Sequence, residues 1–140
     1  MKKIFLVSTL LIIISCGTKK VVSTNTLYEV LTEQNDGGAS IQFYEILTEA
    51  KEIKMLLGDD NLKNKIQEKD IETSNFIILN SGYKNEGNNK IEIESVEETT
   101  SNIIVKLKEN TNNKPVDIEL GTVNPYLILK INSKKEIIFK

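Results

Sequence analysis

Hydrophobic and polar residues alternate along the second half of the chain. Residues 90–96, 103–108 and 116–120 place apolar side chains at every second position, mostly with charged residues between them. Alternation with period two is typical of a strand that buries one face and exposes the other. In the first run the alternation slips at Ser95 and Val96, which predicts a β-bulge or bend. These runs favour an antiparallel sheet.

Two further pairs of strands are predicted as hairpins. Residues 26–31 and 40–46 flank the Asn-Asp-Gly-Gly sequence at 35–38, whose glycines accept the positive φ that tight turns need. Near the C-terminus, residues 126–131 and 136–139 are expected to form a last hairpin, with the short polar segment between them as its turn.

The segment between these hairpins changes period. Apolar residues recur at helical spacing over residues 48–57, Thr48 can cap the start of this helix, and Gly58 stands where it should end. Residues 63–70 are charged and predicted as loop or loose helix, and residues 75–80 form an apolar run expected at the centre of a sheet. The pattern therefore predicts an α+β fold class: a small antiparallel β-rich domain with one short helix.

The N-terminus has the layout of a secretory signal peptide. A short basic segment precedes an apolar run at residues 4–14, which is too short for the roughly 20 residues that a membrane-spanning helix needs. We therefore divide the chain into a signal peptide at residues 1–15, a tether at residues 16–25 and one β-rich domain at residues 26–140.

Cys16, the sole cysteine, ends the sequence Ile-Ile-Ser-Cys, which resembles the lipobox of bacterial lipoproteins. In that family the cysteine becomes the first residue of the mature protein and carries a diacylglyceryl group and a further fatty acid such as palmitate. Two or more acyl chains anchor a protein stably in a membrane. The alternatives are an uncleaved membrane helix and an ordinary signal peptide with an incidental cysteine.

The residues after Cys16 bear on location within the cell envelope. Gly17 is not the aspartate that retains similar lipoproteins at the inner membrane. Lys19 and Lys20 differ from the acidic residues that follow the cysteine in surface-exported lipoproteins. The resemblance therefore implies a lipid-anchored protein on the periplasmic face of the outer membrane.

Composition removes several kinds of chemistry. The chain has no histidine and no arginine, so Ser-His-Asp catalysis, Cys-His catalysis and histidine metal sites are excluded. A single cysteine cannot form an internal disulfide or a structural zinc site. The formal net charge of −2 and the absence of a basic stripe argue against a nucleic-acid partner. We expect a protein that is not an enzyme and has no metal or cofactor.

Five stretches of the predicted domain share a pattern with a known family. They are residues 91–98 (IEIESVEE), 104–109 (IVKLKE) and 124–131 (NPYLILKI) in the second half, together with residues 40–57 and 70–79 in the first. Together they resemble the C-terminal domain of the protease complex subunit PrcB family. The family has a Thr-Gly-Gly-Tyr turn before the first of these strands, whereas this chain has Asn-Glu-Gly-Asn-Asn-Lys at that place. The resemblance implies an accessory subunit of an envelope protease.

Two loops hold the candidate binding residues. The polar loop at 81–89 is of the kind that often carries function, and Pro125 belongs at a strand start or edge, next to an aromatic residue that suits recognition. A plain hairpin loop and a core aromatic ring are the simpler interpretations. Acidic turns at 35–38 and 59–61 lack the spacing of a known calcium loop and are explained by turn or cap chemistry. The candidates are Tyr83, Asn85, Gly87, Asn124, Pro125 and Tyr126.

Two functions from different classes follow. The first is a membrane-anchored, non-enzymatic accessory subunit that holds an envelope protease or another protein through a sheet edge or through the loops at 34–40 and 81–90. The second is a lipoprotein that carries a small apolar ligand or lipid inside a curved sheet, because many strands are apolar and few polar side chains converge. An enzyme would have to use carboxylates or serines without histidine.

Overall fold

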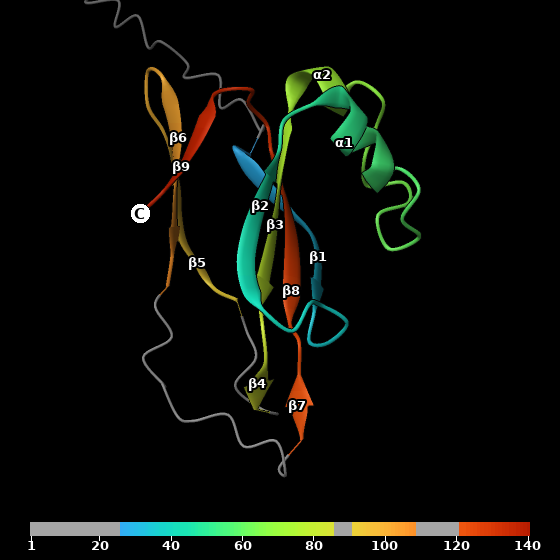
Figure 1. Ribbon diagram of the computed structural model, residues 1–140. Coiled ribbons are helices and arrows are strands. Elements are labelled where there is room, and N and C mark those ends of the chain that lie inside the picture. Colours follow the sequence, from blue (N-terminus) through green and yellow to red (C-terminus); the bar gives the residue numbers. More distant parts are fainter. Residues whose placement is uncertain (1–25, 86–90, 109–120) are drawn as a thin grey trace, which may run out of the picture.

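The computed structural model describes residues 26–85, 91–108 and 121–140. A four-stranded central sheet lies between a three-stranded outer sheet on one face and two short helices on the other (Figure 1). The elements are β1 Tyr28–Gln34, β2 Gln42–Leu47, α1 Ala50–Leu56, α2 Asp70–Thr73, β3 Asn75–Ser81, β4 Lys84–Asn85, β5 Ile93–Glu98, β6 Asn102–Leu107, β7 Thr122–Val123, β8 Tyr126–Ile131 and β9 Glu136–Phe139. The fold is therefore β-rich and mostly antiparallel, with two short helices where one was predicted.

The central sheet has the strand order β1-β8-β3-β2, and every neighbouring pair is antiparallel. The predicted hairpin of residues 26–31 and 40–46 is wrong, because β1 and β2 lie at opposite edges of this sheet. The two strands with the longest apolar runs, β3 and β8, take the centre, where both faces are covered. The prediction of a central strand at residues 75–80 is confirmed.

The outer sheet has the order β5-β6-β9, in which β5 and β6 are antiparallel but β6 and β9 are parallel. The predicted C-terminal hairpin is therefore also wrong: both strands form, but in different sheets. The segment between them crosses from one sheet to the other and is held by β3, since the backbone N–H of Asn75 donates to the Ser133 carbonyl oxygen (3.1 Å) and its side-chain amide donates to that of Lys135 (3.0 Å).

One hydrophobic cluster fills the space between the two sheets. The central sheet contributes alternate residues of β3 and β8, and the outer sheet contributes residues of β6 and β9. Ile137 of β9 joins this cluster, so burial of its side chain gives a physical reason for the crossing of the chain. Among the described residues, the buried members of this cluster are Ile77, Leu79, Ile103, Val105, Leu127, Leu129, Ile131 and Ile137.

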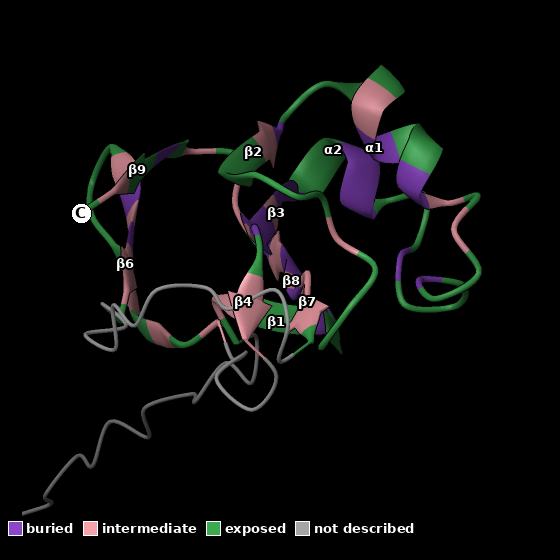
Figure 2. Ribbon diagram, turned by 60° about the horizontal axis from the view of Figure 1, so that its bottom comes forward, coloured by how far each residue is buried: buried purple, intermediate pink, exposed green. Residues whose placement is uncertain are grey.

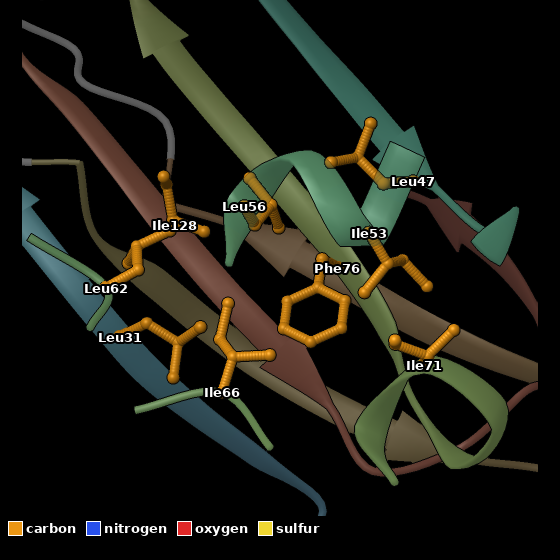
Figure 3. Close-up of a cluster of buried hydrophobic side chains, with 9 residues drawn as sticks. All are labelled: Leu31, Leu47, Ile53, Leu56, Leu62, Ile66, Ile71, Phe76 and Ile128. Carbon is orange, nitrogen blue, oxygen red and sulfur yellow. The ribbon is translucent and has the colours of Figure 1, made fainter. Parts of the chain in front are cut away.

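A second cluster lies on the other face of the central sheet, beneath the helices (Figure 3). Phe76 has no exposed surface and stands among the side chains of both helices and of the segment between them. The members are Leu31, Leu47, Ile53, Leu56, Leu62, Ile66, Ile71, Phe76 and Ile128.

Helix α1 confirms the helix predicted at residues 48–57, but Thr48 is not its cap. Glu49 occupies the N-cap position, and the Glu52 carboxylate accepts hydrogen bonds from the backbone N–H groups of Thr48 and Glu49 (both 3.2 Å). A carboxylate in the first turn also suits the positive end of the helix dipole. The second helix, α2, begins at Asp70, the last residue of the segment predicted as loop or loose helix.

The predicted irregularity in the strand at 90–96 is present. The β5–β6 register shifts between Ile93 and Ser95, one residue before the predicted place. The strand predicted at residues 116–120 lies outside the described residues, as do the predicted signal peptide and the predicted tether. Within the part of the chain that the structure describes, no helix has the length and apolarity to cross a membrane.

Candidate functional site

Three segments meet at one end of the central sheet. They are the β1–β2 loop (residues 35–41), the β3–β4 junction (residues 81–85) and the β7–β8 junction (residues 122–126). The short strands β4 and β7 pair with each other and extend the ladder of β3 and β8 beyond this end (Figure 1). We call these three segments the junction cluster. It contains every candidate binding residue that the structure describes.

The β1–β2 loop is held to the β7–β8 junction by two hydrogen bonds. The backbone N–H of Gly38 donates to the carbonyl oxygen of Asn124 (2.8 Å). The backbone N–H of Asn124 donates in turn to Oδ1 of Asp36 (2.9 Å). Residues far apart in the sequence are thereby fixed to each other at the end of the sheet.

Asn80, at the end of β3, joins the same loop from the other side. Its side chain is buried, its Oδ1 accepts the backbone N–H of Ala39 (2.8 Å), and its Nδ2 donates to the carbonyl oxygens of Ala39 (2.8 Å) and Ile41 (2.5 Å). A buried amide with these bonds satisfies loop backbone groups that no strand pairs. Asn80 therefore orders the loop.

Gly38 permits this close packing. A Cβ atom at this position would lie 2.2 Å from Oδ1 of Asn80 and 2.7 Å from the carbonyl oxygen of Asn124. Both distances are shorter than any tolerated contact, and the second involves backbone. The glycines at 37 and 38 were predicted as turn formers, but Gly38 is needed because two segments approach each other closely there.

Backbone hydrogen bonds lower the pKa of the Asp36 carboxyl group. The N–H of Asn124, and to a smaller degree that of Gly37, hold the pKa of Asp36 below the ordinary aspartate value, because these donors favour the charged form. The carboxylate stays exposed to solvent, so it is an ordered negative charge at the surface of the junction cluster.

This bond makes the loop sensitive to acid. A lowered folded-state pKa means that the charged carboxylate contributes stability above the ordinary aspartate pKa of about 3.9, and that this contribution is lost as the pH falls through the lowered value. We expect Asp36→Asn to lower the melting temperature at pH 7, and we expect the difference from wild type to be smaller at pH 2.5, where more of the wild-type carboxylate is protonated. Asp60→Asn, in the exposed loop after α1, is the control. An equal loss at both pH values would contradict this role for the charge.

The structure places the predicted binding residues in two groups. Tyr83 is half exposed and Asn85 lies in β4, opposite Thr122, so both are at the surface of the junction cluster. Gly87 lies outside the described residues. The remaining three hold the fold: Asn124 through the bonds above, Pro125 by full burial, and Tyr126 by packing against the helix-side cluster.

Two residues that hold this end of the sheet together were not predicted from the sequence. Asp36 and Asn80 make hydrogen bonds that assemble the junction cluster. In the sequence, Asp36 is typical of a turn and Asn80 is typical of the polar end of a strand. An asparagine directly after four apolar residues was the available signal, because it places a polar side chain next to a core strand.

The acidic turn at 59–61 forms a local bond, whereas Asp36 of the turn at 35–38 bonds to Asn124 far along the chain. Oδ1 of Asp59 accepts the backbone N–H of Asn61 (2.7 Å), as turn chemistry predicts. The described residues contain no group of three or more Asp, Glu, His or Cys side chains placed to bind a metal ion.

Comparison with known proteins identifies no relative: no family model, curated protein or solved structure matches the chain. The similarity to the PrcB family stays a prediction from the sequence.

Proposed function

We propose that the protein is a lipoprotein of the bacterial cell envelope, anchored through Cys16, and that it acts as a non-enzymatic binding subunit for another protein. The junction cluster is its binding end. The resemblance of several strands to the PrcB family makes an envelope protease the first partner to test.

The observation that carries this proposal is the position of the two ends of the central sheet. The domain begins beside Asn132, which donates from its backbone to the carbonyl oxygen of Leu27 (2.9 Å) and from its side chain to that of Thr26 (2.7 Å). Asn124, at the other end of β8, holds the junction cluster. Eight residues of extended chain span roughly 26 Å. The junction cluster therefore faces away from the point where the tether enters the domain.

A membrane anchor at one end and ordered loops at the other suit a protein that presents a surface to a partner. Loops on a rigid scaffold carry binding function more often than strands do. The hydrogen bonds of Asp36, Asn80 and Asn124 supply that rigidity, which reduces the conformational entropy lost on binding.

In the described residues, the apolar side chains that motivated the ligand-carrier hypothesis form the hydrophobic core. They form two packed clusters, one on each face of the central sheet. For this reason we rank the binding-subunit function first.

The test is crosslinking of the lipidated protein in intact envelopes, followed by affinity purification and mass spectrometry. We expect one dominant partner, whose recovery falls at least tenfold in Tyr83→Ala. Met55→Ala is the matched control, because it removes another exposed large side chain (68% exposed, against 50% for Tyr83) on α1, away from the junction cluster. Failure to recover any reproducible protein partner would contradict the proposal. Equal recovery from both variants would move the binding surface away from Tyr83.

A further inference from the structure

Strand β2 is an unusual sheet edge. The other edges of the two larger sheets carry features that discourage pairing with another chain. Strand β1 has a register shift near Leu31 and exposed glutamates, β5 has a register shift and a series of glutamates, and β9 has only four residues. Strand β2 has six residues in unbroken register with β3, and Glu45 is its single charge.

The backbone of β2 has hydrogen-bonding groups on its outer side that pair with no strand in the described residues. The bond from the Ser81 N–H to the Pro125 carbonyl oxygen (3.0 Å) shows that odd-numbered residues of β3 face β8. Even-numbered residues of β3 therefore face β2, and the register assigns Phe43, Glu45 and Leu47 to bonds with β3. The N–H and C=O groups of Gln42, Tyr44 and Ile46 then point outward, and no described residue bonds to them.

The side chains along this edge are apolar and exposed. Ile41 is 70% exposed, Tyr44 56% and Phe43 36%. Figure 2 shows most of β2 in the colour of exposed residues, in contrast to the buried β3 beside it. The Tyr44 ring also contacts the ring of Phe139 in β9, with centroids 4.1 Å apart, so it has a defined position.

This edge is continuous with the junction cluster. A Cβ atom on Gly82 would lie 2.8 Å from the backbone nitrogen of Gln42, so the start of β2 lies directly against the β3–β4 junction. Tyr83, half exposed, follows Gly82 in the chain. An extended segment bound along β2 would therefore reach the proposed binding end.

The charge on β2 indicates what kind of strand fits. A second copy of this chain, pairing β2 with β2, would bring another Glu45 and no basic residue, because β2 contains none. A strand with Lys or Arg opposite Glu45 would instead form an opposite-charge pair across the ladder. The exposed rings of Phe43 and Tyr44 suit apolar side chains at the two adjoining positions.

We propose that β2 binds an extended strand of the partner protein, which adds to the central sheet as a fifth strand. The bound strand has apolar residues opposite Phe43 and Tyr44 and a Lys or Arg opposite Glu45. The partner's backbone pairs with Gln42, Tyr44 and Ile46, which is the β-augmentation mode of peptide recognition. This inference rests on the proposed function, since it specifies the surface and the partner chemistry of the same binding subunit.

The test uses the full chain in intact envelopes with the photocrosslinker p-benzoylphenylalanine in place of Tyr44. We expect an adduct with one partner polypeptide, crosslinked within a segment that has Lys or Arg beside apolar residues. Gln42→Pro should lower the adduct yield at least tenfold, because it removes an outward N–H without removing a bond to β3. Glu45→Lys should do the same through charge alone. Glu33→Pro makes the equivalent change on the opposite edge and should leave the yield within twofold.

Several results would overturn the inference: no adduct, an adduct of two copies of this chain, a yield insensitive to Gln42→Pro, or a crosslinked segment without Lys or Arg. The same photocrosslinker at Tyr83 separates this inference from the proposed function. Partner capture at Tyr83 but not at Tyr44 would leave the binding subunit standing and reject the β2 edge. Capture at neither position would count against both.

Discussion

Replacing Phe76 with alanine is expected to lower the free energy of unfolding by about 3–5 kcal/mol. Phe76, a residue of β3, has no exposed surface and packs beneath the helices, so its removal leaves a cavity that the rigid central sheet cannot close (Figure 3). A domain of this size has a total stability of about 5–15 kcal/mol, so the loss is a large fraction of the whole. Urea unfolding of the full chain, followed by circular dichroism, measures it.

The control for this prediction is Met55→Ala. Met55 is 68% exposed on α1, so truncation of its side chain should change the stability by less than about 0.5 kcal/mol. A similar small effect for Phe76→Ala would mean that the helices do not pack on the central sheet as described.

Substitution of Cys16 by alanine is expected to remove membrane anchoring through lipid. The sulfur of Cys16 is the atom to which a diacylglyceryl group would be attached, and the chain has no other cysteine to replace it. Incorporation of labelled palmitate should fall to background, and the form with a cleaved, acylated N-terminus should disappear from the mass spectrum. With its acyl chains lost, the protein would lack the two-chain anchor that makes membrane attachment stable.

Thr18→Ala is the matched control for this experiment, because it changes a polar residue just after the cysteine and leaves the Ile-Ile-Ser-Cys sequence intact. Labelling of this variant should equal that of the wild type. Continued palmitate labelling of Cys16→Ala, or a wild-type protein that takes up no label, would reject the lipobox interpretation and leave an uncleaved membrane helix or an ordinary signal peptide as the alternatives.

The candidate site shows where prediction from the sequence reached its limit. Loops at 34–40 and 81–90 were predicted as binding loops, and the structure brings their described residues to the same end of the sheet. The bonds that join them, from Asn80 to the β1–β2 loop and from Asn124 to Asp36, were not predicted. The first bond joins residues that are 41 positions apart in the sequence, and the second joins residues that are 88 positions apart. Bonds over such separations leave no periodic signal in the sequence.

The sequence by itself determined where the longer described strands and α1 lie, but not α2, β4 or β7. The apolar run of β3, the alternation of β6 and the helical spacing of α1 all arise from which side chains face the core, and this depends on neighbours two to four positions away. The slip in β5 was visible for the same reason, because a bulge changes the local phase.

Only the tertiary structure decided which strands pair. Both predicted hairpins joined strands that are neighbours in the sequence, yet β8 lies between β1 and β3, and β9 leaves β8 to pair in parallel with β6. Thr26 and Asn132 bond across 106 positions. The physical reason is that pairing is set by the burial of whole strand faces. The most apolar strands gain most from a central place with both faces covered, and more polar ones are left at the edges.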